Sequence, residues 1–157
     1  MTRSRPHLKD EARTFPHVLR LPARMDSLNA FIEFIGQTAE ALGLEAVLIP
    51  KLKLAGEELL VNVVHYAYSD TDAAGDIELR CGMADPETFC MAVLDQGTPF
   101  NPLLARAPDL SEDIDQRPVG GLGVFLVREI ADRLDYCRKE ETNVVLFCKK
   151  IQSETAA

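Results

Sequence analysis

The sequence predicts an α+β domain, a two-layer sandwich with helices on one face of a mixed, largely antiparallel sheet. One expected strand is followed by two helical stretches, then by a pair of adjacent strands, a third helix and a second pair of strands. Helices and strand pairs are therefore grouped along the chain rather than strictly alternating, a pattern typical of α+β folds.

Length and charge narrow the class of protein. A chain of 157 residues is about one domain long, and we expect a single domain over residues 14–150 between a flexible tail at 1–13 and a disordered tail at 151–157. No apolar run approaches the roughly 18 residues of a membrane span, and the polar N-terminus does not resemble a signal peptide. We therefore expect a cytoplasmic protein with no membrane partner. A net charge of −8 without a basic stripe argues against a nucleic-acid partner.

The first elements are a strand and an amphipathic helix. Residues 14–21 fit a short strand, and residues 26–42 repeat apolar side chains at the spacing of one helical face. Either Asp26 or Ser27 fits the N-cap of this helix, and Gly43 fits its C-terminal end.

A second, more apolar helix is expected from about Glu45 or Pro50 to Tyr68. Helical spacing places three polar residues on one of its stripes: Glu58, Asn62 and His65. Polar groups in an apolar setting are costly unless something binds them, so this stripe is a candidate site.

The remaining strands are predicted from alternating or nearly continuous apolar residues, and a long loop is predicted from a stretch rich in glycine. Residues 95–123 lose periodicity and are rich in glycine, proline and acidic residues, as expected of a functional lid. Around this loop we expect strands at 77–83 and 88–94, a helix at 122–134, and strands at 135–139 and 142–149. The four cysteines lack C-x-x-C spacing and lie in apolar stretches, so we expect buried, reduced thiols.

Three segments together carry a resemblance: EELLVNVVHYAY at 57–68, LDQGTPFNP at 94–102, and GGLGVFLVREIAD at 120–132. In order and spacing they resemble the N, G1 and G2 boxes of the GHKL ATPase superfamily, and among its branches the anti-sigma-factor serine/threonine kinases. The resemblance covers about Leu21 to Lys149. It implies the Bergerat ATP-binding fold, with ATP and Mg²⁺ as ligands.

The resemblance implies a role for each matching residue. Asn62 would hold Mg²⁺, and Glu58 would act as the general base on the attacking hydroxyl. Asp95 would accept a hydrogen bond from the adenine amino group. The other nucleotide-binding positions would be Gly97, Pro99, Phe100, Asn101, Gly120, Gly121, Leu122 and Gly123. His65 departs from the commonest family form, and we expect a histidine at the helix rim without a ligand role.

The implied activity is that of an ATP-dependent serine/threonine protein kinase. Its substrate would be a small anti-sigma-antagonist (STAS-type) protein, with a sigma factor as a further partner and a homodimer as the assembly. One alternative is an ATP-dependent binding switch without kinase activity. A second, a detached histidine-kinase catalytic domain, fits less well with the short lid at 103–119 and the Pro-Phe-Asn-Pro sequence. The acidic residues of the lid indicate a solvated loop or, alternatively, a docking surface.

Overall fold

A five-stranded sheet forms one layer of the computed structural model, which describes residues 7–67, 75–104 and 121–151. The strand order is β1-β2-β3-β5-β4, and each neighbouring pair is antiparallel. The strands are β1 (His17–Pro22), β2 (Asp76–Asp85), β3 (Thr88–Asp95), β4 (Arg133–Lys139) and β5 (Thr142–Lys150). The predicted α+β class is confirmed, and the sheet that was expected to be mixed is antiparallel at every pair among the described strands.

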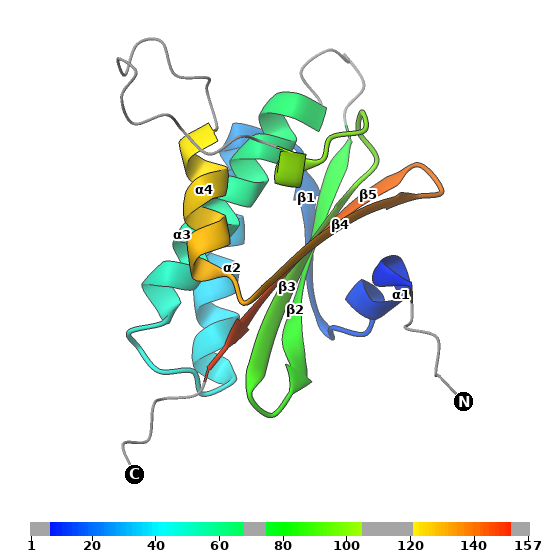
Figure 1. Ribbon diagram of the computed structural model, residues 1–157. Coiled ribbons are helices and arrows are strands. Elements are labelled where there is room, and N and C mark those ends of the chain that lie inside the picture. The colour runs from blue at the N-terminus through cyan, green and yellow to red at the C-terminus, as the bar shows by residue number, and fades with distance from the viewer. Residues whose placement is uncertain (1–6, 68–74, 105–120, 152–157) are drawn as a thin grey trace, which may run out of the picture.

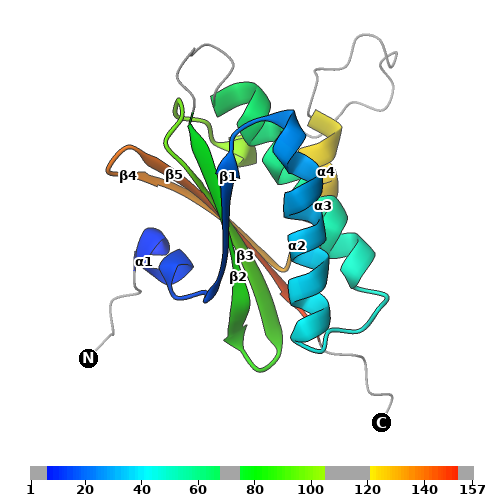
Figure 2. The same cartoon turned by 180° about the vertical axis from the view of Figure 1, so that it is seen from behind.

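Three helices form the second layer and cover one face of the sheet (Figures 1 and 2). They are α2 (Leu28–Ala41), preceded by the 3₁₀ turn η1 (Met25–Ser27), α3 (Ile49–Asn62) and α4 (Gly121–Ile130). Gly43 follows α2 with a positive φ of 81°, which is the conformation expected of a residue that ends a helix. No helix in the described ranges is long and apolar enough to cross a membrane.

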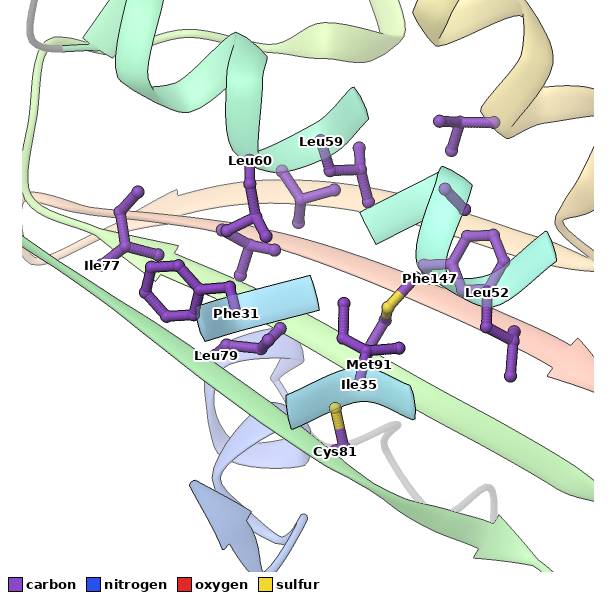
Figure 3. Packing of buried hydrophobic residues seen from close by; sticks show 14 of the residues in the cluster. Phe31, Ile35, Leu52, Leu59, Leu60, Ile77, Leu79, Cys81, Met91 and Phe147 are labelled. Carbon is purple, nitrogen blue, oxygen red and sulfur yellow. The ribbon is translucent and has the colours of Figure 1, made fainter. Parts of the chain in front are cut away.

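The main core lies between these helices and the sheet (Figure 3). Phe31 and Ile35 of α2 pack with side chains from α3 and from three strands, and both are fully buried. Gly56 of α3 faces Ile35 so closely that a Cβ at this position would collide with its side chain. This contact between α2 and α3 therefore requires glycine.

The described part of the expected N-terminal tail is a helix, α1 (Leu8–Arg13), on the opposite face of the sheet (Figure 2). Ala12 and Phe15 are buried there against β3 and β5. Arg133 of β4 donates to both carboxylate oxygens of Glu11, at 2.6 and 3.0 Å. The segment expected to be a tail is therefore helical from Leu8 to Arg13, because its few apolar residues cover the face of the sheet opposite α2, α3 and α4.

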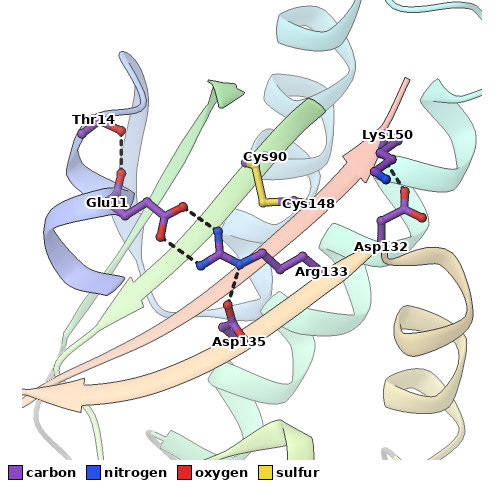
Figure 4. The surroundings of a disulfide bond; sticks show 8 residues. All are labelled: Glu11, Thr14, Cys90, Asp132, Arg133, Asp135, Cys148 and Lys150. Carbon is purple, nitrogen blue, oxygen red and sulfur yellow. Dashed lines mark hydrogen bonds and ion pairs between the residues drawn. A yellow bond between two sulfur atoms is a disulfide. The ribbon is translucent and has the colours of Figure 1, made fainter. Parts of the chain in front are cut away.

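Cys90 of β3 and Cys148 of β5 are joined in a disulfide beneath α1 (Figure 4). The prediction of four reduced thiols is therefore wrong for this pair, whereas Cys81 and Cys137 are free. The two bonded residues are 58 positions apart, and only the register of β3 with β5 places them directly opposite each other. Spacing along the chain contains no information about that register.

Two helix ends also differ from prediction. The helix expected to reach Leu134 ends at Ile130, because the chain then joins β5: Asp132 N donates to Cys148 O, and Lys150 N donates to Asp132 Oδ2. The helix expected to reach Tyr68, which lies outside the described residues, leaves α-helical geometry after Asn62. It continues as a π-helical segment, η2 (Val63–Ala67).

Candidate functional site

The C-terminal turn of α3 contains a buried amide without a partner. Asn62 is 3% exposed, and its Nδ2 has no hydrogen-bond partner among the described residues. A buried, unsatisfied amide costs about 1–3 kcal/mol. Because the two ends of an amide exchange places on a half-turn of the side chain, either a donor or an oxygen ligand can be presented here. The site therefore has room for a partner that the described residues do not supply.

Glu58 lies one helical turn before Asn62 and meets the beginning of α4. Its carboxylate occupies the space in which a Cβ of Gly123 would stand, so a larger residue at 123 would displace the carboxylate from this position. Burial, and to a lesser extent the charge of Glu57, raises the pKa of the Glu58 carboxyl above its usual range. A carboxylate with a raised pKa is suited to accept a proton.

The loop after β3 docks on the π-helical segment. Gly97 lies against Ala67, and a Cβ on Gly97 would collide with the Ala67 carbonyl, which accepts a hydrogen bond from Thr98 N at 2.8 Å. Beside this contact the rings of Tyr66 and Phe100 stack, with centroids 4.8 Å apart and planes inclined by 15°. Such π-helical segments frequently occur at functional sites. In this structure the segment receives the loop that follows Asp95.

Asp95 is a buried carboxylate at the end of β3. Its Oδ1 accepts from Gly97 N at 2.9 Å and from Asn143 Nδ2 at 3.0 Å. Burial raises the pKa of Asp95, and these two hydrogen bonds and the charge of Arg138 oppose that rise only in part. Both hydrogen bonds formed with the described residues end on Oδ1, so Oδ2 remains for a ligand.

Three residues of this network were not predicted: Tyr136 and Arg138 on β4, and Asn143 on β5. Tyr136 donates from its hydroxyl to Asn143 Oδ1 at 2.7 Å, and Arg138 donates to the same oxygen at 3.0 Å. Arg138 also donates to Gly97 O at 2.9 Å. The one signal in the sequence was an amide, Asn143, at the start of the apolar run VVLFC, where a polar residue is unexpected.

The structure places the start of α4 beside Glu58, and it places the loop after Asp95 against Ala67, which follows the helix that carries Asn62. Pro99 is exposed, and Asn101 Oδ1 accepts from Leu103 N at 2.9 Å at the 3₁₀ turn η3 (Pro102–Leu104).

Some of the remaining predicted positions lie within the residues that the structure describes, and others lie outside them. Gly121 and Leu122 lie in the first turn of α4, whereas Gly120 and the acidic residues of the lid lie outside the described residues. His65 is exposed, as expected of a rim residue, although the expected stripe with Asn62 is interrupted by the looser π-helical winding.

Metal binding here would depend on few protein ligands. In the part of the chain that the structure describes, no group of three or more histidine, cysteine, aspartate or glutamate side chains could hold a metal ion. Mg²⁺ commonly takes one or two protein oxygens and completes its shell with water and phosphate oxygens. Asn62, with its unpartnered buried amide, fits that mode of binding.

Comparison with known proteins gives a family match. Residues 21–149 match the model of the family described as "Histidine kinase-like ATPase domain". The chain is 26% identical over 140 residues to a protein named serine-protein kinase RsbW from Bacillus cereus (strain Q1), covering 87% of this chain and 85% of that protein. It is 24% identical over 140 residues, with the same coverage, to the protein of that name from Bacillus mycoides (strain KBAB4).

A solved structure supports the fold. The RsbU and RsbW domains of Rv1364c from Mycobacterium tuberculosis superpose with a TM-score of 0.59 at 12% identity. The match covers 85% of this chain and 32% of that one. At this identity the likeness concerns the fold alone.

Proposed function

The chain belongs to the histidine kinase-like ATPase domain family, and from this membership we propose that it binds Mg-ATP and acts as a serine/threonine protein kinase. The observation that carries the proposal is the pairing of Asn62 and Glu58. Asn62 has a buried amide nitrogen without a partner in the described part of the chain, and Glu58 holds its carboxylate against Gly123 in the first turn of α4.

The phosphates of ATP would lie at the beginning of α4. The N-terminus of a helix presents free N–H groups and the positive end of the helix dipole, both of which favour anions. Asn62 would hold Mg²⁺ through its amide oxygen, and the bound ion supplies neutralisation of charge on the phosphate oxygens. Asp95 would receive the adenine amino group on its free Oδ2.

Glu58 would take the proton of the attacking hydroxyl. As the hydroxyl oxygen of a serine or threonine forms its bond to the γ-phosphorus, the bond from that phosphorus to the β–γ bridging oxygen breaks. ADP then leaves with the electron pair of the broken bond. The proton passes to the Glu58 carboxylate, whose raised pKa makes it a better acceptor than an ordinary glutamate.

The proposed phosphate acceptor is a small anti-sigma-antagonist protein of STAS type, with a sigma factor as a second, sequestered partner. Similarity over 87% of this chain to proteins named serine-protein kinase supports transfer to a hydroxyl. We further propose that the protein works in the cytoplasm as a homodimer.

The test is phosphate transfer from labelled ATP to a candidate STAS-type protein, with matched variants of two adjacent carboxylates. Glu58→Gln is expected to abolish transfer while a thermal shift with Mg-ATP persists, and Glu57→Gln is expected to retain transfer at neutral pH. Asp95→Asn should remove the thermal shift itself. Because the base must be ionised, the rate should fall as the pH drops through the raised pKa of Glu58.

Each outcome has a distinct meaning. Transfer that persists in Glu58→Gln would refute the assigned base. Binding of Mg-ATP and partner without transfer by the wild type would indicate an ATP-dependent switch. Label on a histidine, recognised by its loss in acid, would indicate a histidine-kinase catalytic domain.

A further inference from the structure

Asn143 is the centre of a hydrogen-bond network that the proposed reaction does not use. Its side chain is 1% exposed and makes four hydrogen bonds, two on each end of the amide. Oδ1 accepts from Tyr136 and Arg138, whereas Nδ2 donates to Asp95 Oδ1 and to Thr98 O, each at 3.0 Å. A buried amide with all four positions filled is held in one orientation.

Arg138 determines which way the amide faces. A guanidinium can only donate, so the end of Asn143 that meets Arg138 must be the oxygen. The NH₂ end must then face Asp95. Because Arg138 also holds Gly97 O at 2.9 Å, the loop that carries Gly97 is tied to the same network.

This orientation affects whether the Asp95 carboxyl group accepts or donates a hydrogen bond to a bound nucleobase. Asn143 Nδ2 and Gly97 N both donate to Oδ1 and so favour the ionised carboxylate, in which Oδ2 is an acceptor only. Burial acts in the opposite direction and is the larger effect on the pKa of Asp95. The two donors therefore limit the rise in this pKa and extend to lower pH the range in which Asp95 is an acceptor.

Adenine and the 6-oxo purines differ in the group that would meet Oδ2. Adenine carries an amino group at position 6, a donor, whereas guanine carries a carbonyl oxygen, an acceptor. An acceptor-only carboxylate matches the first and repels the second. A site built to hydrogen-bond one group discriminates strongly against a ligand that lacks it, because buried polar groups are then left unpaired.

We propose that Asn143, held by Tyr136 and Arg138, is a positioning residue that makes the site selective for adenine over 6-oxo purine nucleotides. The inference rests on the proposed binding of ATP and adds a residue that does not itself touch the reacting atoms. It assigns the selectivity to β4 and β5, outside the three motifs that carry the family resemblance.

The test compares dissociation constants for Mg-ATP and Mg-ITP, measured by titration calorimetry between pH 5 and 8 in buffers of constant ionic strength. These two nucleotides share every phosphate contact and differ in the base edge that would meet Asp95. In Asn143→Leu we expect the affinity for Mg-ATP to fall by about tenfold, the size of one charge-assisted hydrogen bond. Affinity for Mg-ITP should change by less than about twofold, since its phosphate contacts are retained.

The pH profile separates positioning from a general loss of structure. Without the Asn143 donor, the pKa of Asp95 should rise further. Binding of Mg-ATP requires the ionised acceptor, so its loss on acidification should begin at a higher pH in Asn143→Leu than in the wild type. The pH dependence of the affinity for Mg-ITP should be the same in Asn143→Leu and in the wild type.

Tyr136→Phe is the milder second variant, because it removes one of the two donors to Asn143 Oδ1 and keeps the ring. It should reduce selectivity in the same direction and by less, even if Asn143→Leu fails to fold. Equal weakening of both nucleotides, or an unmoved pH profile in a folded variant, would overturn the inference. If the wild type binds neither nucleotide, the proposed ATP site fails together with it. If the wild type binds both equally, only the selectivity argument fails.

Discussion

Replacement of Asn62 by leucine should stabilise the nucleotide-free protein and abolish its response to Mg-ATP. Leucine has the same branched skeleton as asparagine but no polar atom, so the buried Nδ2 that lacks a partner disappears. Removal of an unsatisfied buried group contributes about 1–3 kcal/mol. For a chain of this length, 1 kcal/mol corresponds to about 3 °C in Tm, so we expect an increase of about 3–9 °C.

The measurement is thermal unfolding with and without saturating Mg-ATP, beside a control that makes the same substitution on a surface. At 100 times Kd, ligand binding should stabilise the wild type by about 2.7 kcal/mol and leave Asn62→Leu unchanged. Asn29→Leu, at the exposed start of α2, reports any gain from helix propensity alone and should keep the full response to Mg-ATP. A less stable Asn62→Leu that still responds to Mg-ATP would refute the argument.

Two further predictions concern the loop contact and the cysteines. Gly97→Ala should destabilise the fold by about 1–3 kcal/mol in urea unfolding, because its Cβ would collide with the Ala67 carbonyl, whereas Gly43→Ala, which has open space, should cost about 1 kcal/mol for its positive φ. Equal losses would contradict the packing argument. Thiol titration of the denatured, unreduced protein should find only Cys81 and Cys137 free, and four thiols would show that the disulfide beneath α1 does not form.

The pattern of apolar residues in the sequence was sufficient to predict most of the helices and strands. Alternation predicted β2, and a nearly continuous apolar run predicted β3. An apolar repeat marked α2, and a stretch that is apolar on nearly all sides marked α3. The features that differed depend on contacts between distant segments. α1 is held by Arg133, more than a hundred residues away, and the π-helical segment forms where the chain receives the loop after β3. Local propensity cannot predict such contacts.

The candidate site was predictable to the extent that it lies within continuous motifs. Glu58 and Asn62 are one helical turn apart, so helical spacing identifies this pair. Asp95, which ends β3, and Gly97 were expected because the segment LDQGTPFNP resembles a family motif. The supporting residues Tyr136 and Asn143 stand on neighbouring strands and meet only through the antiparallel register. A sequence pattern contains no such register, and these residues appeared only in the structure.

The distribution of unpaired polar groups itself indicates where a ligand belongs. Asn143 is buried, and all four hydrogen-bonding positions of its amide are filled, so its burial costs little free energy of folding. Its role is to orient its neighbours, Asp95 among them. Asn62 is also buried, with one end unpaired among residues 7–67, 75–104 and 121–151, and burial raises the pKa of both Glu58 and Asp95. A cation or a hydrogen-bond donor would stabilise the carboxylates of Glu58 and Asp95. Asn62 would be satisfied by an acceptor at its NH₂ end or, after a half-turn of the amide, by a cation at its oxygen. A magnesium ion at Asn62, a hydroxyl at Glu58 and an amino group at Asp95 would satisfy all three at once, and Mg-ATP with a protein hydroxyl contains that set of groups.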